Sequence, residues 1–364
     1  MASDANVVLA EIGKYRPCKV RDSSIPAAGV NPEKYLHWSN PPSSGLGDRM
    51  INVLAAQTIA WYECKTLFLI WPPSSKGLSG TFPTYSSLFE TTPGLVVIDK
   101  KKGNGKKIGF EVPKSLKPEV LDLAPGWGYP MAVIYNIKRR LSSELMNNEH
   151  IILEDVVRVY NALGRHLKPR PKISRLIASN FVPRVKGAIG LHIRRGDKTT
   201  VDSHAMQGIS SAMLATLHRT TPQVLDEVLK IFPGATVFIA SDSTAEKQRY
   251  STFIRERGGS AIVFRKHGHS RNKKWIPYNI GIEDALADIW LLAQCSVVLQ
   301  STSMSSFSAF GAAIGNGKLI NLLPASSKCQ MRRCHRFSDI VVGLITPWEN
   351  RTDLLMDLKN VRYN

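Results

Sequence analysis

The sequence predicts an α/β protein built from two doubly wound, Rossmann-like domains that face each other across a cleft. Three observations support this prediction. The chain has 364 residues, more than one ordinary hydrophobic core accommodates. Its second half alternates short β-branched runs with stretches of helical periodicity, the order that gives a parallel sheet with right-handed crossovers. Its first half shows a looser version of the same alternation.

A proline-broken stretch at residues 168–172, Lys-Pro-Arg-Pro-Lys, is the natural junction between the two domains. We therefore expect an N-terminal α/β domain over residues 1–168 and a C-terminal Rossmann-like domain over residues 169–345. Residues 346–364 are expected to form a tail or helix that packs back on the N-terminal domain.

In the first half, a glycine turn at Gly45 and Gly47 leads into a helix whose apolar residues follow helical spacing. These residues are Ile51, Leu54, Ala55, Thr58, Ile59 and Tyr62. Compact β-branched runs predict strands, and further helical periodicity predicts helices. The expected strands are 67–71 and 95–98, and the expected helices are 132–147, 153–167 and 174–180.

In the second half, the same criteria predict five strands separated by helices. The strands are 187–193, 236–240, 261–264, 297–300 and 318–322. The helices are 207–219, 223–231, 245–257, 282–295 and 307–314.

Polar clusters follow three of these strands, at residues 192–198, 241–243 and 301–306. In an open α/β sheet, ligands bind beyond the carboxyl ends of the strands. The fork-shaped donors of Arg194 and Arg195 match phosphate oxygens. Because side chains alternate along a strand, we expect one of these arginines to bind the ligand and the other to hold the protein's own structure. The alternative for Arg195 is a structural ion pair with Asp197.

Two stretches that precede helices are suited to bind anions through backbone N–H groups. The serine-rich residues 301–306 would form a diphosphate cradle, and the alternative is an ordinary serine N-cap. Gly45 and Gly47 would let an anion approach bare backbone, and the alternative is a plain tight turn.

Asp284 and Asp288 lie one turn apart on a predicted helix and share a face. A carboxylate at Asp288 could accept hydrogen bonds from N1 and N2 of guanine. The alternative is a solvated helix face.

Charge and hydropathy narrow the class of partner. The net charge of +19, from 48 basic and 29 acidic residues, favours anionic partners, but no nucleic-acid-binding motif is present and no nucleic acid is expected. The N-terminus lacks a leader pattern and the apolar runs are too short to span a bilayer. We expect a cytoplasmic protein without a membrane segment, or a lumenal one if an upstream segment is missing.

Five cysteines argue against a disulfide framework, since Cys18, Cys64 and Cys295 are isolated in the sequence. Cys329 and Cys334 lie close together and could form a local disulfide or two free thiols. A zinc site there would need a ligand from elsewhere besides the neighbouring histidine, so no metal site is expected.

The stretch His-Ile-Arg-Arg-Gly-Asp-Lys at residues 192–198 closely resembles the phosphate-binding motif of the α-1,6-fucosyltransferases, both the animal core enzymes and the bacterial Nod-factor enzymes. Residues 238–242 and 287–303 look like the second and third motifs of that family, in order. Leu167-Lys-Pro also has a counterpart. The resemblance covers roughly residues 165–315, and the N-terminal half matches only through the stretch from Gly45 to Gly47 and the helix after it.

This resemblance implies a GT-B fold, GDP-fucose as donor substrate, a glycan acceptor, inversion at the anomeric carbon, and no cofactor or metal. The N-terminal domain would then face the acceptor, and the C-terminal domain would bind the donor. By position, His192 and Asp288 would recognise guanine, and Arg194 would hold the β-phosphate. The other residues of the implied donor site are Gly45, Gly47, Arg195, Asp242, Ser301, Thr302 and Ser303.

The resemblance also assigns the proton transfer. The family has a glutamate ten positions after the motif histidine, and this chain has Asp202 there, one methylene shorter. Asp202 would be the catalytic base, Lys198 its relay partner, and Asp197 with Arg195 would brace the loop. The chemistry fits, because inverting transfer needs a carboxylate for the acceptor proton and positive charge at the departing diphosphate. Two alternatives remain: a transferase for another GDP-sugar, and a non-catalytic nucleotide- or carbohydrate-binding relative.

Overall fold

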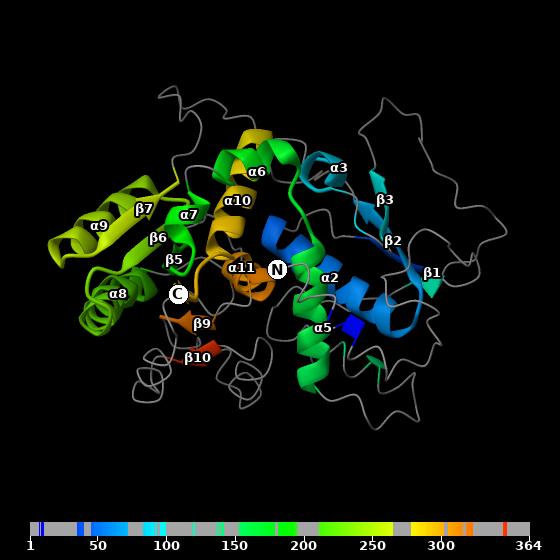
Figure 1. Ribbon diagram of the computed structural model, residues 1–364, viewed down its shortest axis with the longest axis horizontal. Coiled ribbons are helices and arrows are strands. Elements are labelled where there is room, and N and C mark those ends of the chain that lie inside the picture. The colour runs from blue at the N-terminus through cyan, green and yellow to red at the C-terminus, as the bar shows by residue number, and fades with distance from the viewer. Residues whose placement is uncertain are drawn as a thin grey trace. The chain divides into compact units, whose positions relative to one another are not determined.

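The fold was obtained as a computed structural model (Figure 1). The residues it describes are 7, 9–10, 35–39, 45–71, 83–90, 92, 95–99, 119–120, 137, 140–141, 153–178, 181–194, 211–264, 278–301, 305–315, 318–322 and 345–347. Contacts divide the chain into a first unit, Met1–Leu176 with Lys266–Ala287, and a second unit, Ile177–Arg265 with Asp288–Asn364. The domain boundaries expected from the sequence remain predictions.

The first unit contains a parallel four-stranded sheet in the order β3-β2-β1-β4. The strands β2 (Thr66–Trp71) and β3 (Leu95–Asp99) confirm two predictions. The strands β1 (Tyr35–Ser39) and β4 (Glu119–Val120) were not predicted. The helices of this unit include α2 (Leu46–Tyr62), α3 (Tyr85–Leu88) and α5 (Leu153–His166), and α6 (Pro171–Ala178) begins in it.

Helix α2 confirms the helix predicted after the glycine turn, but every one of its residues except Asp48 is buried. At its end, Cys64 adopts a positive φ of 58°, and the Lys65 N–H donates to the carbonyl oxygen of Ala60 at 2.8 Å. This is a Schellman motif, which satisfies the last carbonyl groups of the helix.

Cys64 corrects the expectation of isolated cysteines, because it is disulfide-bonded. Its partner lies outside the described residues, as do Cys18, Cys329 and Cys334. Sequence spacing could not show this bond, because it does not tell which thiols meet in space. Cys295 is free and buried, and burial raises the pKa of its thiol.

The second unit contains a six-stranded parallel sheet in the order β10-β9-β8-β5-β6-β7 (Figure 1). All five predicted strands are confirmed, and β10 was not predicted. The strands are β5 (Ile189–Ile193), β6 (Thr236–Ser241), β7 (Ser260–Val263), β8 (Val297–Gln300), β9 (Lys318–Asn321) and β10 (Ile345–Pro347). The chain is therefore of the α/β class with parallel sheets, as predicted.

The helices of this unit are α7 (Val182–Val185), α8 (Ser211–Ile231), α9 (Thr244–Glu256), the end of α10 (Tyr278–Leu292), and α11 (Ser306–Gly315). One prediction here is wrong, because α8 is one helix that contains Pro222 rather than two helices separated by it. A proline removes one helical hydrogen bond and favours a break. The buried residues Leu217 and Val224 on either side hold both halves against the same core.

Strand β5 has a different neighbour on each face of the sheet. Ile189, Leu191 and Ile193 join a core with residues of α8 and α9. Gly190 faces the other way, where a Cβ atom would come within 2.8 Å of Leu292 and 3.2 Å of the Cys295 sulfur. The alternation that puts Gly190 on this face also puts His192 there.

No helix among the described parts of the chain is long and apolar enough to cross a membrane.

Candidate active site

The sheet order brings the three predicted polar clusters to one edge. Strand β5 lies between β6 and β8, with Ile193 opposite Ser241 and His192 opposite Gln300. The Ser301 N–H donates to the carbonyl oxygen of His192 at 2.9 Å, which continues the ladder beyond β8. The residues after β5, β6 and β8 therefore start from adjacent points at the carboxyl edge of the sheet, where ligands of α/β proteins bind.

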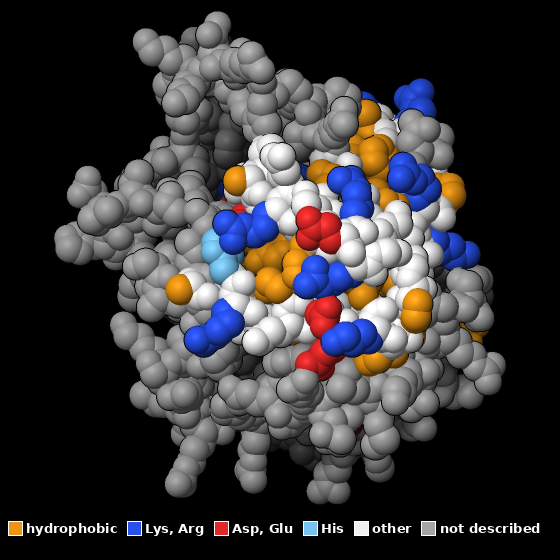
Figure 2. All heavy atoms as spheres, turned by 90° about the vertical axis from the view of Figure 1, so that its left-hand side faces the viewer, with side chains coloured by type: hydrophobic (Ala, Val, Ile, Leu, Met, Phe, Trp, Pro, Cys, Tyr) orange, Lys and Arg blue, Asp and Glu red, His pale blue; other side chains and the backbone are white. Residues whose placement is uncertain are grey.

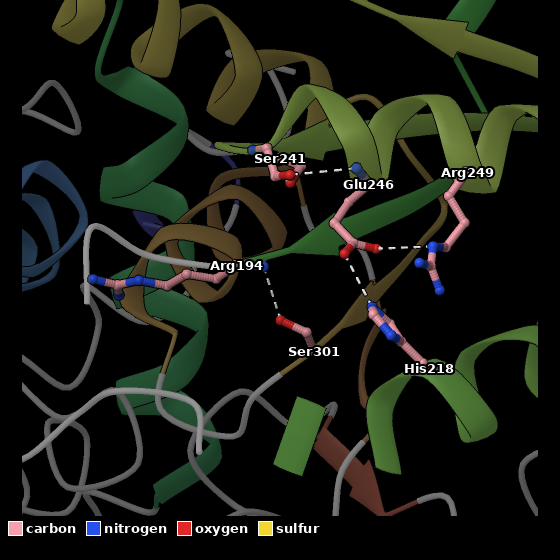
Figure 3. A network of polar contacts seen from close by, with 7 residues as sticks. Arg194, His218, Ser241, Glu246, Arg249 and Ser301 are labelled. Atoms are coloured by element: carbon pink, nitrogen blue, oxygen red, sulfur yellow. Dashed lines mark hydrogen bonds and ion pairs between the residues drawn. The ribbon is translucent and has the colours of Figure 1, made fainter. Parts of the chain in front are cut away.

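Arg194 is the first residue after β5, and Ser301 anchors its backbone. The Arg194 N–H donates to Ser301 Oγ at 3.0 Å, and Ser301 is fully buried (Figure 3). The half-buried Arg194 side chain extends away from this anchor, on the side opposite Glu246 (Figure 3). Within the described structure its guanidinium has no hydrogen-bond or ion-pair partner. The site thus holds a guanidinium fork whose backbone is anchored at the strand end and which no described residue binds, so that it can meet an anion.

His192 is held by residues of α11 and by its neighbour on β8. Its Nδ1 lies 3.0 Å from Ser308 Oγ and 3.3 Å from Ser305 Oγ. The ring stacks on Phe307 with 4.9 Å between ring centroids, and the Ser308 hydroxyl donates to Gln300 Oε1 at 2.7 Å. The imidazole is 5% exposed, so its position is set by packing and hydrogen bonds together.

Asp288 is buried, which shows that the alternative of a solvated helix face is wrong. Asp284 and Asp288 are 3% and 2% exposed. The Lys247 ammonium lies 3.9 Å from an Asp288 carboxylate oxygen and donates to the carbonyl oxygen of Phe264 at 3.3 Å. A buried carboxylate beside a lysine is the usual arrangement, because an isolated buried charge is costly. Lys247 was not predicted as a partner of Asp288. The available signal was its position in the helix that directly follows β6.

The hydroxyl groups after β6 hold the start of α9. The Ser243 N–H donates to Ser241 Oγ at 3.1 Å, and the Glu246 N–H donates to Ser243 Oγ at 3.3 Å. Ser243 is thus an ordinary N-cap. Asp242, which the family resemblance implies as a donor-site residue, is exposed at this turn.

Glu246 joins α9 to α8. Its buried carboxylate lies 3.0 Å from His218 Nε2 and 3.8 Å from Arg249 Nε (Figure 3). This cluster lies beside the strand ends but was not predicted, because spacing did not show that α8 and α9 would place these side chains together.

The glycine turn of the first unit, at Gly45 and Gly47, was expected to let an anion approach the backbone. Gly45 is the N-cap of α2 in an extended conformation, and a Cβ atom there would meet only an Asp48 oxygen, at 3.9 Å. Neither strain nor crowding therefore requires glycine at this position. Asp48 places an acidic group in the first turn, which works against an anion at the helix start. Gly47 is buried in the same turn.

Several expected site residues lie outside the described residues: Arg195, Asp197, Lys198, Asp202, Thr302 and Ser303. No cluster of three or more His, Cys, Asp or Glu side chains that could hold a metal ion occurs among the described ones. Figure 2 shows Lys and Arg side chains spread over the described part of this face, with Asp and Glu side chains among those near its centre.

No family model and no curated protein matches the sequence. Among solved structures, the chain is similar to NodZ alpha-1,6-fucosyltransferase soaked with GDP-fucose, with 19% identity and a TM-score of 0.46 over 78% of this chain and 92% of that chain. It is also similar to POFUT1 in complex with GDP, with 13% identity and a TM-score of 0.43 over 79% of this chain and 96% of that one.

A mutant of Arabidopsis thaliana FUT1 in complex with GDP is similar at 12% identity and a TM-score of 0.42, over 89% of this chain and 76% of that chain. At such identities and TM-scores, the function of this chain has to be argued from its own residues.

Proposed function

We propose that the chain is an inverting, metal-independent glycosyltransferase of GT-B fold that transfers L-fucose from GDP-fucose to a hydroxyl group of a glycan. One observation carries the proposal: the guanidinium of Arg194, which has no partner among the described residues, lies at the carboxyl end of β5. The stretch that contains it, residues 192–198, resembles the phosphate-binding motif of α-1,6-fucosyltransferases.

The leaving group sets the task of Arg194. As the bond from fucose to GDP breaks, negative charge builds up on the β-phosphate, and the transition state is stabilised by donors already in place. The guanidinium supplies two parallel donors to phosphate oxygens. Ser301 keeps the Arg194 backbone at the strand end, which limits where the side chain can reach.

We assign the recognition of the guanine ring to His192 and Asp288. An ionised carboxylate is an acceptor only, which matches the N1–H and N2–H donors of guanine. The neighbouring ammonium of Lys247 orients the Asp288 carboxylate.

The remaining roles rest on the resemblance. Asp202 takes the acceptor proton, with Lys198 as its relay partner, while Arg195 and Asp197 brace the loop. Asp242, Thr302, Ser303, Gly45 and Gly47 complete the donor site, and the N-terminal domain contributes the residues that bind the acceptor glycan.

The test is a thermal-shift screen followed by a transfer assay. GDP-fucose and GDP should raise the melting temperature of the full chain, and ADP should not, because a ligand that binds only the folded state stabilises it. The purified protein should release GDP from GDP-fucose in the presence of a glycan acceptor and a metal chelator. Asp202→Asn should still bind GDP and lose transfer.

The outcomes separate the alternatives. A larger shift and turnover with another GDP-sugar would replace fucose as the donor. Binding of GDP without transfer to any acceptor in a glycan panel would indicate the non-catalytic relative. No shift with any guanine nucleotide would refute the proposed donor site.

A further inference from the structure

We propose that Gln300 and Ser308 are positioning residues that keep His192 in the neutral tautomer with its proton on Nδ1, so that Nε2 is a hydrogen-bond acceptor. The inference deepens the proposed function, on which its second step rests, by naming the ring atom that would accept from the guanine base. Its first step concerns only the chain's own protons and can be tested separately.

The argument starts from counting protons. A serine hydroxyl has one proton to donate, and an amide oxygen can only accept. The shortest contact of the Ser308 hydroxyl is with Gln300 Oε1, at 2.7 Å, and a second possible acceptor, the Ser305 carbonyl oxygen, is at 3.5 Å. The Ser308 proton is therefore committed to Gln300.

The proton on His192 follows from this commitment. Nδ1 lies 3.0 Å from Ser308 Oγ, a distance at which one of the two atoms must donate. Because Ser308 has given its proton to Gln300, the donor is Nδ1–H. A charge on so buried a ring is costly, so the proposed form is the neutral one, in which Nε2 carries no proton. Ser305 Oγ, at 3.3 Å from the same nitrogen, is a second acceptor for that proton.

The relay, meaning the hydrogen bonds from His192 through Ser308 to Gln300, is strengthened by burial. Gln300 and Ser308 have no exposed surface, and His192 has 5%. In such surroundings a lost partner costs more than in water, because the donor or acceptor left over has no solvent to replace it. The ring cannot turn away easily, since it stacks on Phe307 and its backbone pairs with Gln300 across β5 and β8.

The second step concerns the nucleotide. With the proton on Nδ1, the lone pair on Nε2 can accept from an N–H group. Guanine offers N–H donors at N1 and N2, and hypoxanthine lacks the amine at N2. A neutral His192 in this tautomer, together with Asp288, would therefore favour GDP over the diphosphate of inosine.

The first measurement is a ¹⁵N–¹H correlation spectrum of the imidazole groups of the full chain. The His192 signals are identified by their absence in His192→Gln. We expect the ring proton on Nδ1. A wild-type spectrum with the proton on Nε2 overturns the inference, whether or not GDP binds.

Two variants at Gln300 form the matched pair. Gln300→Met has nearly the same shape and no acceptor, so the Ser308 proton should turn to Nδ1 and the ring proton should move to Nε2. Gln300→Glu keeps an acceptor and should keep the Nδ1 tautomer. An unchanged tautomer in Gln300→Met overturns the relay. If Gln300→Met does not fold, Gln300→Leu, which also lacks the acceptor, takes its place.

Binding gives the second readout. Wild type and Gln300→Glu should bind GDP more tightly than inosine diphosphate by about tenfold, roughly the value of one hydrogen bond, and Gln300→Met should show a smaller preference, because only Asp288 then accepts from the amine at N2. Equal preference in Gln300→Met and wild type overturns the second step. If the Nδ1 tautomer is found but neither nucleotide binds, the relay stands and the proposed function fails.

Discussion

Two polar clusters lie at the carboxyl edge of the second-unit sheet, and they differ in charge and exposure. The tip cluster comprises the neutral, buried side chains of His192, Gln300, Ser301, Ser305 and Ser308. The α9 cluster comprises the side chains of His218, Glu246 and Arg249. In it a buried carboxylate meets groups whose side chains are 23% and 54% exposed.

The difference suggests that the two clusters have different roles, one in the reaction and one in stability. A buried hydrogen-bond network fixes geometry and proton positions, because water cannot replace a partner that is lost. A cluster with exposed charges tolerates small displacements and is screened by salt. We therefore expect changes next to the tip cluster to act mainly on the reaction, and changes in the α9 cluster to act mainly on stability.

The largest expected effect is on the reaction, at Arg194. Arg194→Ala removes the guanidinium that would meet the departing diphosphate, so transition-state stabilisation should fall by about 3 kcal/mol or more, a loss of at least about 100-fold in kcat. The free energy of unfolding should change little, because the guanidinium has no partner among the described residues.

The measurements are initial rates at saturating GDP-fucose and urea unfolding of the same samples. Arg194→Lys is the control, because it keeps the charge without the fork, and it should fall between wild type and alanine. Near wild-type turnover in Arg194→Ala would remove Arg194 from the mechanism.

What the sequence could predict depends on whether an element is determined by neighbouring residues or by residues far away in the sequence. The helix α2 and the strands β5, β6 and β8 were predictable, because periodicity and β-branched runs are local signals. Strand β1 mixes histidine and serine with apolar residues and runs toward two prolines, and β4 has two residues. Their strand character comes from pairing with β2 and with each other, which sequence patterns do not show.

The site shows the same limit. Arg194 and Ser301 were predictable, because ligands bind where parallel strands end. Ser308 contacts His192 across 116 positions of sequence, and Lys247 reaches Asp288 from another helix. Such contacts depend on how helices pack, so the residues that hold the predicted ones were found only in three dimensions.

The next largest effect should be on stability, at Glu246. Glu246→Gln keeps the shape and removes the charge that meets His218, and should lower the free energy of unfolding by about 2 kcal/mol. Arg249→Gln is the matched control, because this exposed arginine lies 3.8 Å from the carboxylate and should contribute about 0.5 kcal/mol or less. Urea unfolding measures both. Equal losses in the two variants would show that the charge on Glu246 is not what links α8 to α9.

A smaller effect on stability is expected at two serines, each of which accepts a hydrogen bond from one backbone N–H. Ser243→Ala removes the N-cap of α9 and should cost about 1 kcal/mol of stability, with transfer unchanged. Ser301→Ala removes the acceptor for the Arg194 N–H and should lower transfer as well. Thermal unfolding and initial rates on both variants give the comparison. If Ser243→Ala lost as much transfer as Ser301→Ala, the proposed difference between the tip cluster and the start of α9 would fail.

The smallest effect is expected at Asp226, a second ionic link between α8 and the end of α9. Its carboxylate lies 2.6 Å from Lys230 Nζ and 2.9 Å from Arg257 Nε, and these hydrogen bonds lower its pKa below the ordinary 3.8. A depressed pKa in the folded state means that the ionised carboxylate adds stability above about pH 3.8, and that this contribution is lost as the pH falls through the folded-state pKa.

The link is exposed, so Asp226→Asn should destabilise least of all these variants, and molar salt should remove most of the difference. Urea unfolding of wild type and Asp226→Asn at neutral and acidic pH, with and without salt, measures this contribution. A contribution that persists in salt and at low pH would mean that Asp226 acts by holding Arg257 over the Phe253 ring, whose centroid lies 3.5 Å from the guanidinium carbon, rather than through its charge. The surface link would then resemble the tip cluster, where packing rather than charge holds the groups in place.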